Sequence, residues 1–392
     1  MLEIGRRALQ PSSRSDVPPF IVMDVMAAAA RIEAGGGRVV HMEVGQPAAP
    51  APQTARTAAK AALDKGDIGY TEALGMPALR QRIARHYQDI HRVAVDPECI
   101  VVTTGSSAGF ILAFLALFEP GDRVAIASPG YPPYRHILTA LGCESVPIEI
   151  SAASNWSITV EALMATHRRT PLRGVLVASP ANPTGTMMRA SALAGLITAA
   201  EAEGIRFISD EIYHGLDYAF PAETAARFSD RAVIINSFSK YFCMTGWRIG
   251  WMVLPEWLLR PVERLQQNLS ISVPTLSQIA ATAAFEGRDE METVKHGYEE
   301  NRRILIEGLP KVGLDRFLPV DGAFYLYADV SRFSRDSLDF AKRMLEQAGV
   351  AATPGIDFDP VHGKEFLRFS YAGSAADMRE AVERIGHWLN KG

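Results

Sequence analysis

The sequence predicts an α/β fold, with a large domain built on a mostly parallel mixed sheet between helices and a smaller α+β domain. Three observations predict it. Short runs rich in Val and Ile alternate with helical patterns from about residue 98 to 254. These runs are almost continuously apolar, which indicates strands buried on both faces. After about residue 285, charged helical segments surround two apolar runs, at 322–330 and 365–373.

The strands of the large domain are expected where β-branched residues gather between turn signals. The runs are CIVVTT (99–104), RVAIAS (123–128), SVPIEI (145–150), GVLVAS (174–179), IRFIS (205–209), AVIINS (232–237) and RIGWMVL (248–254). Helices are expected between them, for example over 108–118 and over 189–204, where Gly204 suits a helix end.

The change of pattern divides the chain into three parts. Residues 1–45 form an N-terminal arm and a helix over 20–36 that joins the small domain, and the first 15 or so residues show no pattern. Residues 46–285 form the large domain and residues 286–392 the small one, with the boundary inside a long helix near 255–300. The small domain is expected to contain helices over 287–309 and 337–349 and a final helix.

Composition excludes several classes of function. The chain has 392 residues, of which 48% are hydrophobic. This length is enough for two domains, because single cores stop growing at roughly 250 to 300 residues. A formal net charge of -4 gives no basic footprint for nucleic acid or an anionic membrane. The longest apolar run, 110–118, is far shorter than the roughly 20 residues of a membrane helix.

Cysteine usage and the N-terminus indicate the cytoplasm. Three scattered cysteines are too few for a disulfide framework or a metal site, so we expect a reducing compartment and no metal. The opening MLEIGRRALQ has arginines but lacks the apolar stretch of a signal peptide.

Polar residues follow five of the predicted strands. In an open parallel sheet, ligands bind outside the carboxyl ends of the strands, so these side chains should meet at one rim. They are Gly105-Ser106-Ser107, Pro129-Gly130-Tyr131, Pro180-Ala181-Asn182-Pro183, Asp210-Glu211, and Ser237 just before Lys240.

Each of these residues has a structural explanation when it is taken alone. A Gly-Ser-Ser before a helix can be a cap, and SPANPTG (179–185) can be only a turn. Tyr131 can be a core aromatic and Asp210 a strand-end acid, while Arg248 can belong to an ion pair and Lys240 can reach solvent. Their convergence at one rim favours a ligand site instead.

One ligand accounts for the whole set. Free backbone amides, serines and an arginine suit a phosphate, and an aromatic side chain suits a flat ring. A carboxylate suits a protonated ring nitrogen, an amide or phenol suits a phenolate oxygen, and a lysine suits an aldehyde. Together these groups indicate pyridoxal 5'-phosphate (PLP).

The motifs that carry these residues resemble those of a known family. SPANPTG, SDEIY (209–213) and SFSKYFCMTGWRIG (237–250), in this order and spacing, are similar to the class I/II aminotransferases, the aspartate-aminotransferase-like group of fold-type I PLP enzymes. The resemblance runs from MEVGQPAAP (42–50) to FLRFSYAG (366–373). It implies a fold-type I architecture and a ping-pong transfer of an amino group from an L-amino acid to a 2-oxo acid.

The resemblance also implies a role for each matching residue. Lys240 would bind the cofactor aldehyde and later move the proton, Asp210 would pair with the pyridine nitrogen, and Tyr131 would stack on the ring. Asn182 and Tyr213 would donate to the phenolic oxygen. The phosphate would be held by Ser106, Ser107, Ser237 and Arg248. Tyr70 would reach the phosphate of the neighbouring subunit in a homodimer, and Arg368, assisted by the backbone of Gly45, would bind the substrate α-carboxylate.

Two other functions are weighed against transamination. Carbon–sulfur lyases and aminocyclopropane-carboxylate synthases share the fold and most of these residues, but release a different group from the substrate. Some transcription regulators use the fold to bind effectors, but they carry a winged-helix domain ahead of it. Here about 40 residues precede VGQPAAP and they contain no basic recognition helix.

The sequence favours a neutral substrate. Dicarboxylate-specific members use a second arginine from the partner subunit, and the stretch 269–287, near its expected place, contains none. Phe20, Tyr70, Tyr131 and Tyr325 would give a largely aromatic pocket if the N-terminal arm folds over it. We therefore expect a neutral, aliphatic or aromatic amino acid as donor, with pyruvate or 2-oxoglutarate as acceptor.

Overall fold

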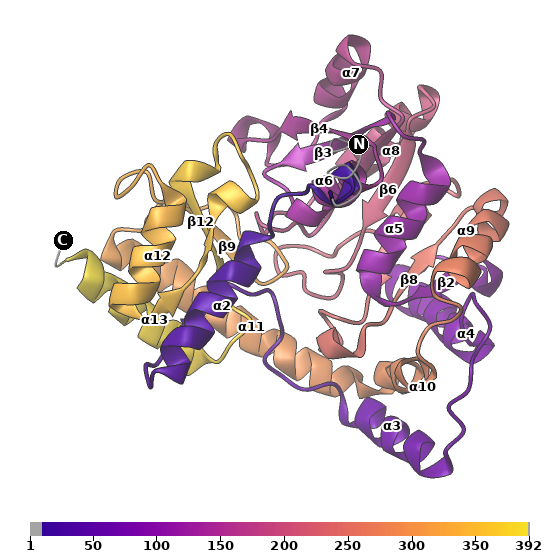
Figure 1. The fold of residues 1–392 in the computed structure, drawn as a ribbon, viewed down its shortest axis with the longest axis horizontal. Coiled ribbons are helices and arrows are strands. Elements are labelled where there is room, and N and C mark those ends of the chain that lie inside the picture. Colours follow the sequence, from indigo (N-terminus) through magenta and orange to yellow (C-terminus); the bar gives the residue numbers. More distant parts are fainter. Residues whose placement is uncertain (1–9, 391–392) are drawn as a thin grey trace, which may run out of the picture.

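The computed structural model describes residues 10–390, and its largest sheet has seven strands in the order β2-β8-β7-β6-β5-β3-β4 (Figure 1). Strand β8 runs antiparallel to both of its neighbours, and the other pairs of this sheet are parallel. The predicted mostly parallel, mixed sheet is confirmed. Its strands are β2 Ile100–Thr103, β3 Arg123–Ser128, β4 Glu144–Glu149, β5 Gly174–Ala178, β6 Arg206–Asp210, β7 Val233–Ser237 and β8 Gly250–Val253.

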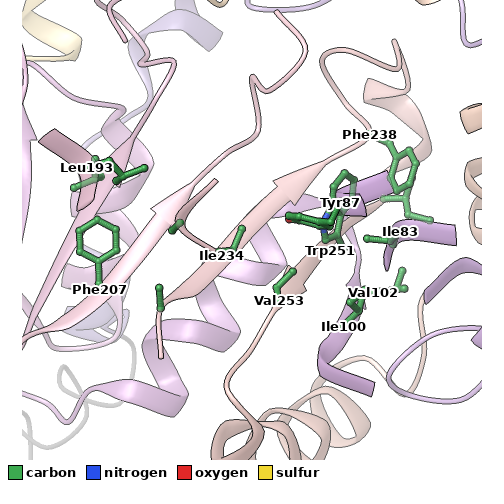
Figure 2. Packing of buried hydrophobic residues seen from close by; sticks show 14 of the residues in the cluster. Ile83, Tyr87, Ile100, Val102, Leu193, Phe207, Ile234, Phe238, Trp251 and Val253 are labelled. Atoms are coloured by element: carbon green, nitrogen blue, oxygen red, sulfur yellow. The ribbon is translucent and has the colours of Figure 1, made fainter. Parts of the chain in front are cut away.

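Apolar residues line both faces of this sheet, which explains the unbroken apolar runs. Successive strand residues point to opposite faces. In β7, Val233 and Ile235 pack into the core on one face, and Ile234 packs into the core on the other. Figure 2 shows Ile234 and its cross-strand neighbour Val253 within the second of these cores.

Helices cover both faces. One face packs against α5 Gly105–Leu117, α6 Pro132–Ala140 and α9 Glu256–Leu269. The core on the other face contains residues of α3 Gln53–Lys65, α4 Pro77–His86, α7 Val160–Arg169, α8 Ala190–Ala202 and α10 Thr275–Ala284. Helix α4 continues as one π-helical turn, Tyr87–His91, and the Tyr87 hydroxyl accepts a hydrogen bond of 3.2 Å from Trp251 Nε1 (Figure 2).

The C-terminal part of the chain forms its own core around a three-stranded antiparallel sheet of order β11-β12-β9. The strands are β9 Tyr325–Asp329, β11 Thr353–Pro354 and β12 Phe366–Ser370, and the helices are α11 Arg288–Gly308, α12 Ser337–Ala348 and α13 Ala375–Leu389. A parallel pair, β1 Val40–His41 and β10 Val350–Ala351, joins an N-terminal segment to this part.

The N-terminal helix α2, Ile21–Ala34, lies against the C-terminal part of the chain (Figure 1). Ala29 and Val39 share a small apolar cluster with Leu345 and Ala351. The predicted N-terminal arm falls partly on residues 1–9, which lie outside the described residues, and Ser13–Ser15 form a 3-10 turn.

One detail of the predicted organisation is wrong. The segment near 255–300 contains three helices, α9, α10 and α11, in place of one long helix. Ile271 adopts a left-handed φ of 64° after α9, and Pro274 precedes α10, so the chain turns between these two helices. We retain the boundaries after residues 45 and 285 as a proposal, because the apolar cores divide near them.

None of the helices within residues 10–390 is long and apolar enough to cross a membrane. Over the same residues, no group of three or more His, Cys, Asp or Glu side chains is arranged to hold a metal ion.

Strand β7 lies inside the large sheet, between β8 and β6, and its burial should contribute to the stability of the sheet. Ile234 is 1% exposed, so Ile234→Ala should lower the free energy of unfolding by about 3 kcal/mol, through lost burial and the cavity left behind. Urea denaturation measures this change. Leu338 on α12 is 49% exposed, and Leu338→Ala should change the value by less than about 0.5 kcal/mol. Equal losses for the two variants would contradict the assignment of the core.

Candidate active site

The carboxyl ends of the parallel strands meet beside a cavity of about 180 Å³. Because β8 is antiparallel, its start lies at the same rim, and this brings Arg248 to the cavity just before the strand. The cavity is lined by residues that follow β2, β3, β5, β6 and β7, by α2, and by residues of the C-terminal part of the chain. They include Phe20, Gly45, Ser106, Ser107, Tyr131, Asn182, Asp210, Tyr213, Lys240, Arg248, Tyr325 and Arg368.

Lys240 enters the cavity from the segment after β7. Its Nζ donates a hydrogen bond of 2.6 Å to the Gly45 carbonyl. Burial, together with the positive charges of Arg368 and Arg248, lowers the pKa of Lys240 to about 8. A side chain at position 45 would lie 1.7 Å from the Tyr325 hydroxyl oxygen, so glycine is required there. The lysine is therefore held in place, and its lowered pKa gives a larger fraction of neutral amine near physiological pH than an ordinary lysine has.

Asp210 ends strand β6 and is 2% exposed. Its Oδ1 accepts a hydrogen bond of 3.0 Å from the Ile212 N–H, and its Oδ2 accepts one from the Tyr134 hydroxyl. Burial raises the pKa of this carboxyl to about 6, although both hydrogen bonds oppose the shift. Asp210 can thus be an anion at neutral pH and would gain much from a cationic partner in the cavity.

A cradle for an anion lies between Arg248 and the start of α5. The N-terminus of α5 has no side-chain cap, so its first amides are available to a ligand. Gly105 has a left-handed φ of 74°, and a Cβ there would lie 2.4 Å from Arg248 Nη2. The glycine therefore allows the guanidinium to approach the helix terminus. Ser106, Ser107, Ser239 and Thr245 line the cavity as well.

Arg368 lies on β12 and is 2% exposed. Its Nη1 donates to Asn182 Oδ1 at 2.9 Å, and its Nη2 donates to Thr353 Oγ1 at 3.1 Å and to the Glu43 carbonyl. The guanidinium carbon lies 4.3 Å from the centre of the Tyr325 ring. The Nε–H is buried and has no partner. Arg368 is thus a fixed, desolvated cation facing a cavity, which suits a carboxylate ligand.

Aromatic and apolar side chains form the remaining wall. Phe20 meets Tyr131 edge to face, with ring centres 5.8 Å apart. The hydroxyls of Tyr213 and Tyr325 lie 2.7 Å apart. The carboxylate of Asp357 accepts hydrogen bonds from the N–H groups of Ile21 and Val22, which fixes the start of α2 beside the cavity.

Two residues singled out from the sequence do not line this cavity. Ser237 is buried, and its hydroxyl is directed to the Ile249 carbonyl at 3.3 Å and to Ser239 Oγ at 3.0 Å. Ser239, two positions later, lines the cavity in its place. Tyr70 is 84% exposed and does not line the cavity of its own chain.

Sequence reasoning missed several lining residues. Tyr134, which contacts Asp210, follows Tyr131 by three positions, a spacing that can place both residues at the start of α6. Val22 and Met23 come from α2, and no local pattern in the sequence connects that helix to strand ends more than eighty residues away.

The chain is similar to known proteins over nearly its whole length. The family model described as aminotransferase class I and II matches residues 38–385. The valine–pyruvate aminotransferase of Mycobacterium tuberculosis is 50% identical over 96% of this chain and 97% of its own. The aspartate aminotransferase of Thermotoga maritima is 32% identical over 96% of this chain and 98% of its own.

A solved structure gives the same result. The crystal structure of an aminotransferase from Mycobacterium tuberculosis matches with a TM-score of 0.95 and 50% identity, covering 98% of this chain and 100% of that one. The predicted fold-type I architecture is therefore confirmed. On the family model, the identity and the shared fold, this chain belongs to the class I and II aminotransferases and is an enzyme of that activity.

Proposed function

We propose that this aminotransferase uses PLP to move the amino group of a neutral L-amino acid, aliphatic or aromatic, to pyruvate or 2-oxoglutarate in two half-reactions. The observation that carries the proposal is the pairing, in one cavity, of the buried Arg368 with an apolar and aromatic wall. A carboxylate suits the arginine, and an uncharged side chain suits the wall.

The residues present fit the cofactor. The uncapped start of α5 and Arg248 suit a phosphate, and the space at Gly105 lets the two approach each other. Ser106, Ser107 and Ser239 would add hydroxyl donors. Asp210 would pair with a protonated ring nitrogen, and Tyr131 would lie against the ring. Because Asn182 Oδ1 already accepts from Arg368, its amide N–H₂ would be the donor to the phenolic oxygen, together with Tyr213.

PLP, when bound, withdraws electrons from the substrate Cα, which makes the Cα proton acidic. The chain supplies the remaining functions. Lys240 Nζ is the proposed general base, because its lowered pKa leaves a useful fraction of neutral amine. Arg368 and the backbone of Gly45 would hold the α-carboxylate and so orient the Cα–H bond toward Lys240.

The wall of the cavity determines the proposed donor. Phe20, just before α2, and Val22 and Met23 from α2, with Val44 and Tyr325, offer apolar contacts to a substrate side chain. Among the described residues that line the cavity, the cations are Lys240, Arg248 and Arg368, each of which already has a proposed role. The relative named valine–pyruvate aminotransferase, at 50% identity, supports a branched aliphatic donor with pyruvate as acceptor.

We also propose a cytoplasmic homodimer with active sites at the subunit interface. The exposed side chains of Tyr70 and Ile271 support this, because their segments meet where the Thr71 N–H donates to Ser272 Oγ at 3.5 Å. Tyr70 would reach the phosphate held by the partner. All three cysteines are unpaired, which supports a reducing compartment.

Capture of PLP by the cofactor-free chain should follow the titration of Lys240. The pKa of Lys240 is lowered to about 8, so the neutral, nucleophilic amine accumulates as pH rises through that value. The rate of appearance of the yellow absorbance band should therefore rise between about pH 7 and about pH 9.5 with a midpoint near 8. Lys240→Ala should show no such band. A midpoint near the ordinary lysine pKa would contradict the proposed environment.

A donor panel tests the proposed function. Valine, alanine and phenylalanine added singly to the PLP-loaded enzyme should bleach the yellow band, and pyruvate should restore it. Aspartate should react at least about 10-fold more slowly, because its second carboxylate would meet apolar side chains. Isobutylamine, which is valine without its carboxylate, should fail because Arg368 would lack a partner. Cysteine, which carries a leaving group on Cβ, extends the panel: release of hydrogen sulfide, ammonia and pyruvate from it without an acceptor would identify a lyase instead.

Hybrid dimers test the role of Tyr70. Chains carrying Tyr70→Phe and chains carrying Lys240→Ala should each form impaired dimers. A purified hybrid of the two would contain one intact site, made of Lys240 from one chain and Tyr70 from the other, and should recover about half of wild-type activity. A hybrid without recovered activity would show that Tyr70 acts within its own chain, and an unimpaired Tyr70→Phe dimer would show that Tyr70 has no role.

A further inference from the structure

A second cavity, of about 270 Å³, is lined by three histidines, His86, His91 and His214. The ring centres of His86 and His91 lie 6.4 Å apart, and those of His91 and His214 lie 5.2 Å apart. Ser237 and Tyr241, on either side of Lys240 in the sequence, line it too. The cavity thus lies near the cofactor site, and none of its histidines has a role in the proposed reaction.

His214 faces a buried carboxylate, Glu211, which follows Asp210 directly. The two side chains are 4% and 1% exposed. Glu211 Oε1 accepts three hydrogen bonds, from Ser209 Oγ at 3.0 Å, Thr224 Oγ1 at 3.1 Å and the Ala225 N–H at 2.8 Å. Glu211 Oε2 and His214 Nδ1 have no hydrogen-bond partner, and these two atoms lie 3.5 Å from each other.

A contact of the other ring nitrogen, Nε2, fixes the tautomer of His214. His214 Nε2 lies 3.1 Å from the Ser179 carbonyl, which can only accept, so Nε2 carries a proton. If that were the only proton, a lone pair on Nδ1 would face a lone pair on Glu211 Oε2. Two unpaired polar atoms in a buried site would then repel each other and remain desolvated.

We propose that Glu211 and His214 share one further proton between Oε2 and Nδ1, and that this neutral pair positions Asp210 and the Ser179–Asn182 segment for the reaction. One proton satisfies both orphaned atoms at once. Burial raises the pKa of Glu211 and lowers that of His214 to about 4. Both directions disfavour separated charges, in agreement with a shared proton.

Charged groups around the pair do not supply another partner. Asp217 is held by Lys295 at 2.9 Å, and Glu223 is paired with Arg227. Burial lowers the pKa of His91 to about 4, so this ring is neutral at physiological pH. Other titratable groups nearby are His86, whose pKa burial lowers to about 3, the hydroxyl of Tyr87, whose pKa burial raises, and the carboxylate of Asp210.

The pair affects the reaction through its neighbours, and this consequence depends on the roles proposed for Asp210 and Asn182. A negative charge on Glu211 raises the pKa of the adjacent Asp210, whereas a neutral Glu211–His214 pair removes that repulsion. The bond from His214 Nε2 to the Ser179 carbonyl fixes the start of the segment that carries Asn182, the partner of Arg368. Glu211 and His214 are therefore positioning residues.

Nitrogen-15 spectra of histidine-labelled, full-length protein without cofactor test the shared proton directly. The His214 Nδ1 signal should show a hydrogen-bonded proton, stay constant from about pH 6 to about pH 9, and move in Glu211→Gln. His362 is a matched control, since its Nε2 lies 3.3 Å from Glu149 Oε1 in an exposed pair and should not respond to Glu211→Gln. If the His214 signal shifts with pH as an isolated ring and does not change in Glu211→Gln, the proposal is overturned, whether or not PLP binds.

Paired variants test the positioning role. His214→Gln can still donate to the Ser179 carbonyl but cannot share the proton, so kcat at about pH 8 should fall at least about fivefold while KM stays within about twofold. Adding Glu211→Gln to the His214→Gln variant makes the site neutral again and should restore most of the lost kcat. His214→Asn, which is too short to reach Ser179, should raise KM instead. A purely structural role would give a double variant worse than either single one, and that outcome would refute the pair.

Discussion

Desolvated charge is the constraint on which the rest of this structure depends. Lys240, Arg248 and Arg368 line one cavity, and burial removes hydration from Lys240 and Arg368, whereas Arg248 is exposed. A buried cation without a partner is costly, so Lys240 and Arg368 must be compensated. Arg368 is compensated by Asn182, Thr353 and the Glu43 carbonyl, and Lys240 by the Gly45 carbonyl and a lowered pKa. The chain thus keeps its cations ready for anionic ligands.

The hydrogen-bond partners of these buried cations come from segments that are distant in the sequence. The Gly45 carbonyl comes from the segment after β1, Asn182 follows β5, and Arg368 lies on β12 in the C-terminal part of the chain. The cavity is complete only when the seven-stranded sheet and the C-terminal core are both formed. Stability and function are linked here, because a change that loosens either core also leaves a buried cation without its partner.

The adjacent carboxylates of Asp210 and Glu211 are subject to the same constraint. Asp210 faces the cavity and Glu211 faces away from it, because successive residues at the end of β6 point in opposite directions. Two adjacent buried anions would repel, and the proposed proton between Glu211 and His214 removes one of the charges. The cavity can then present a single anion to a cationic ring nitrogen.

The sequence by itself determined the strands, the fold class and most of the rim, because apolar runs and the motifs around Asn182, Asp210 and Lys240 are local signals. It could not decide which serine faces the cavity. Nothing in the sequence distinguishes Ser237 from Ser239. In the folded chain the Ser237 hydroxyl contacts the Ile249 carbonyl and so does not face the cavity. The break of the expected long helix into α9, α10 and α11, the approach of α2 to the cavity and the pairing of Glu211 with His214 depend on contacts between remote segments. Tertiary structure decided these features, since hydrogen-bond partners and burial are properties of the packed chain.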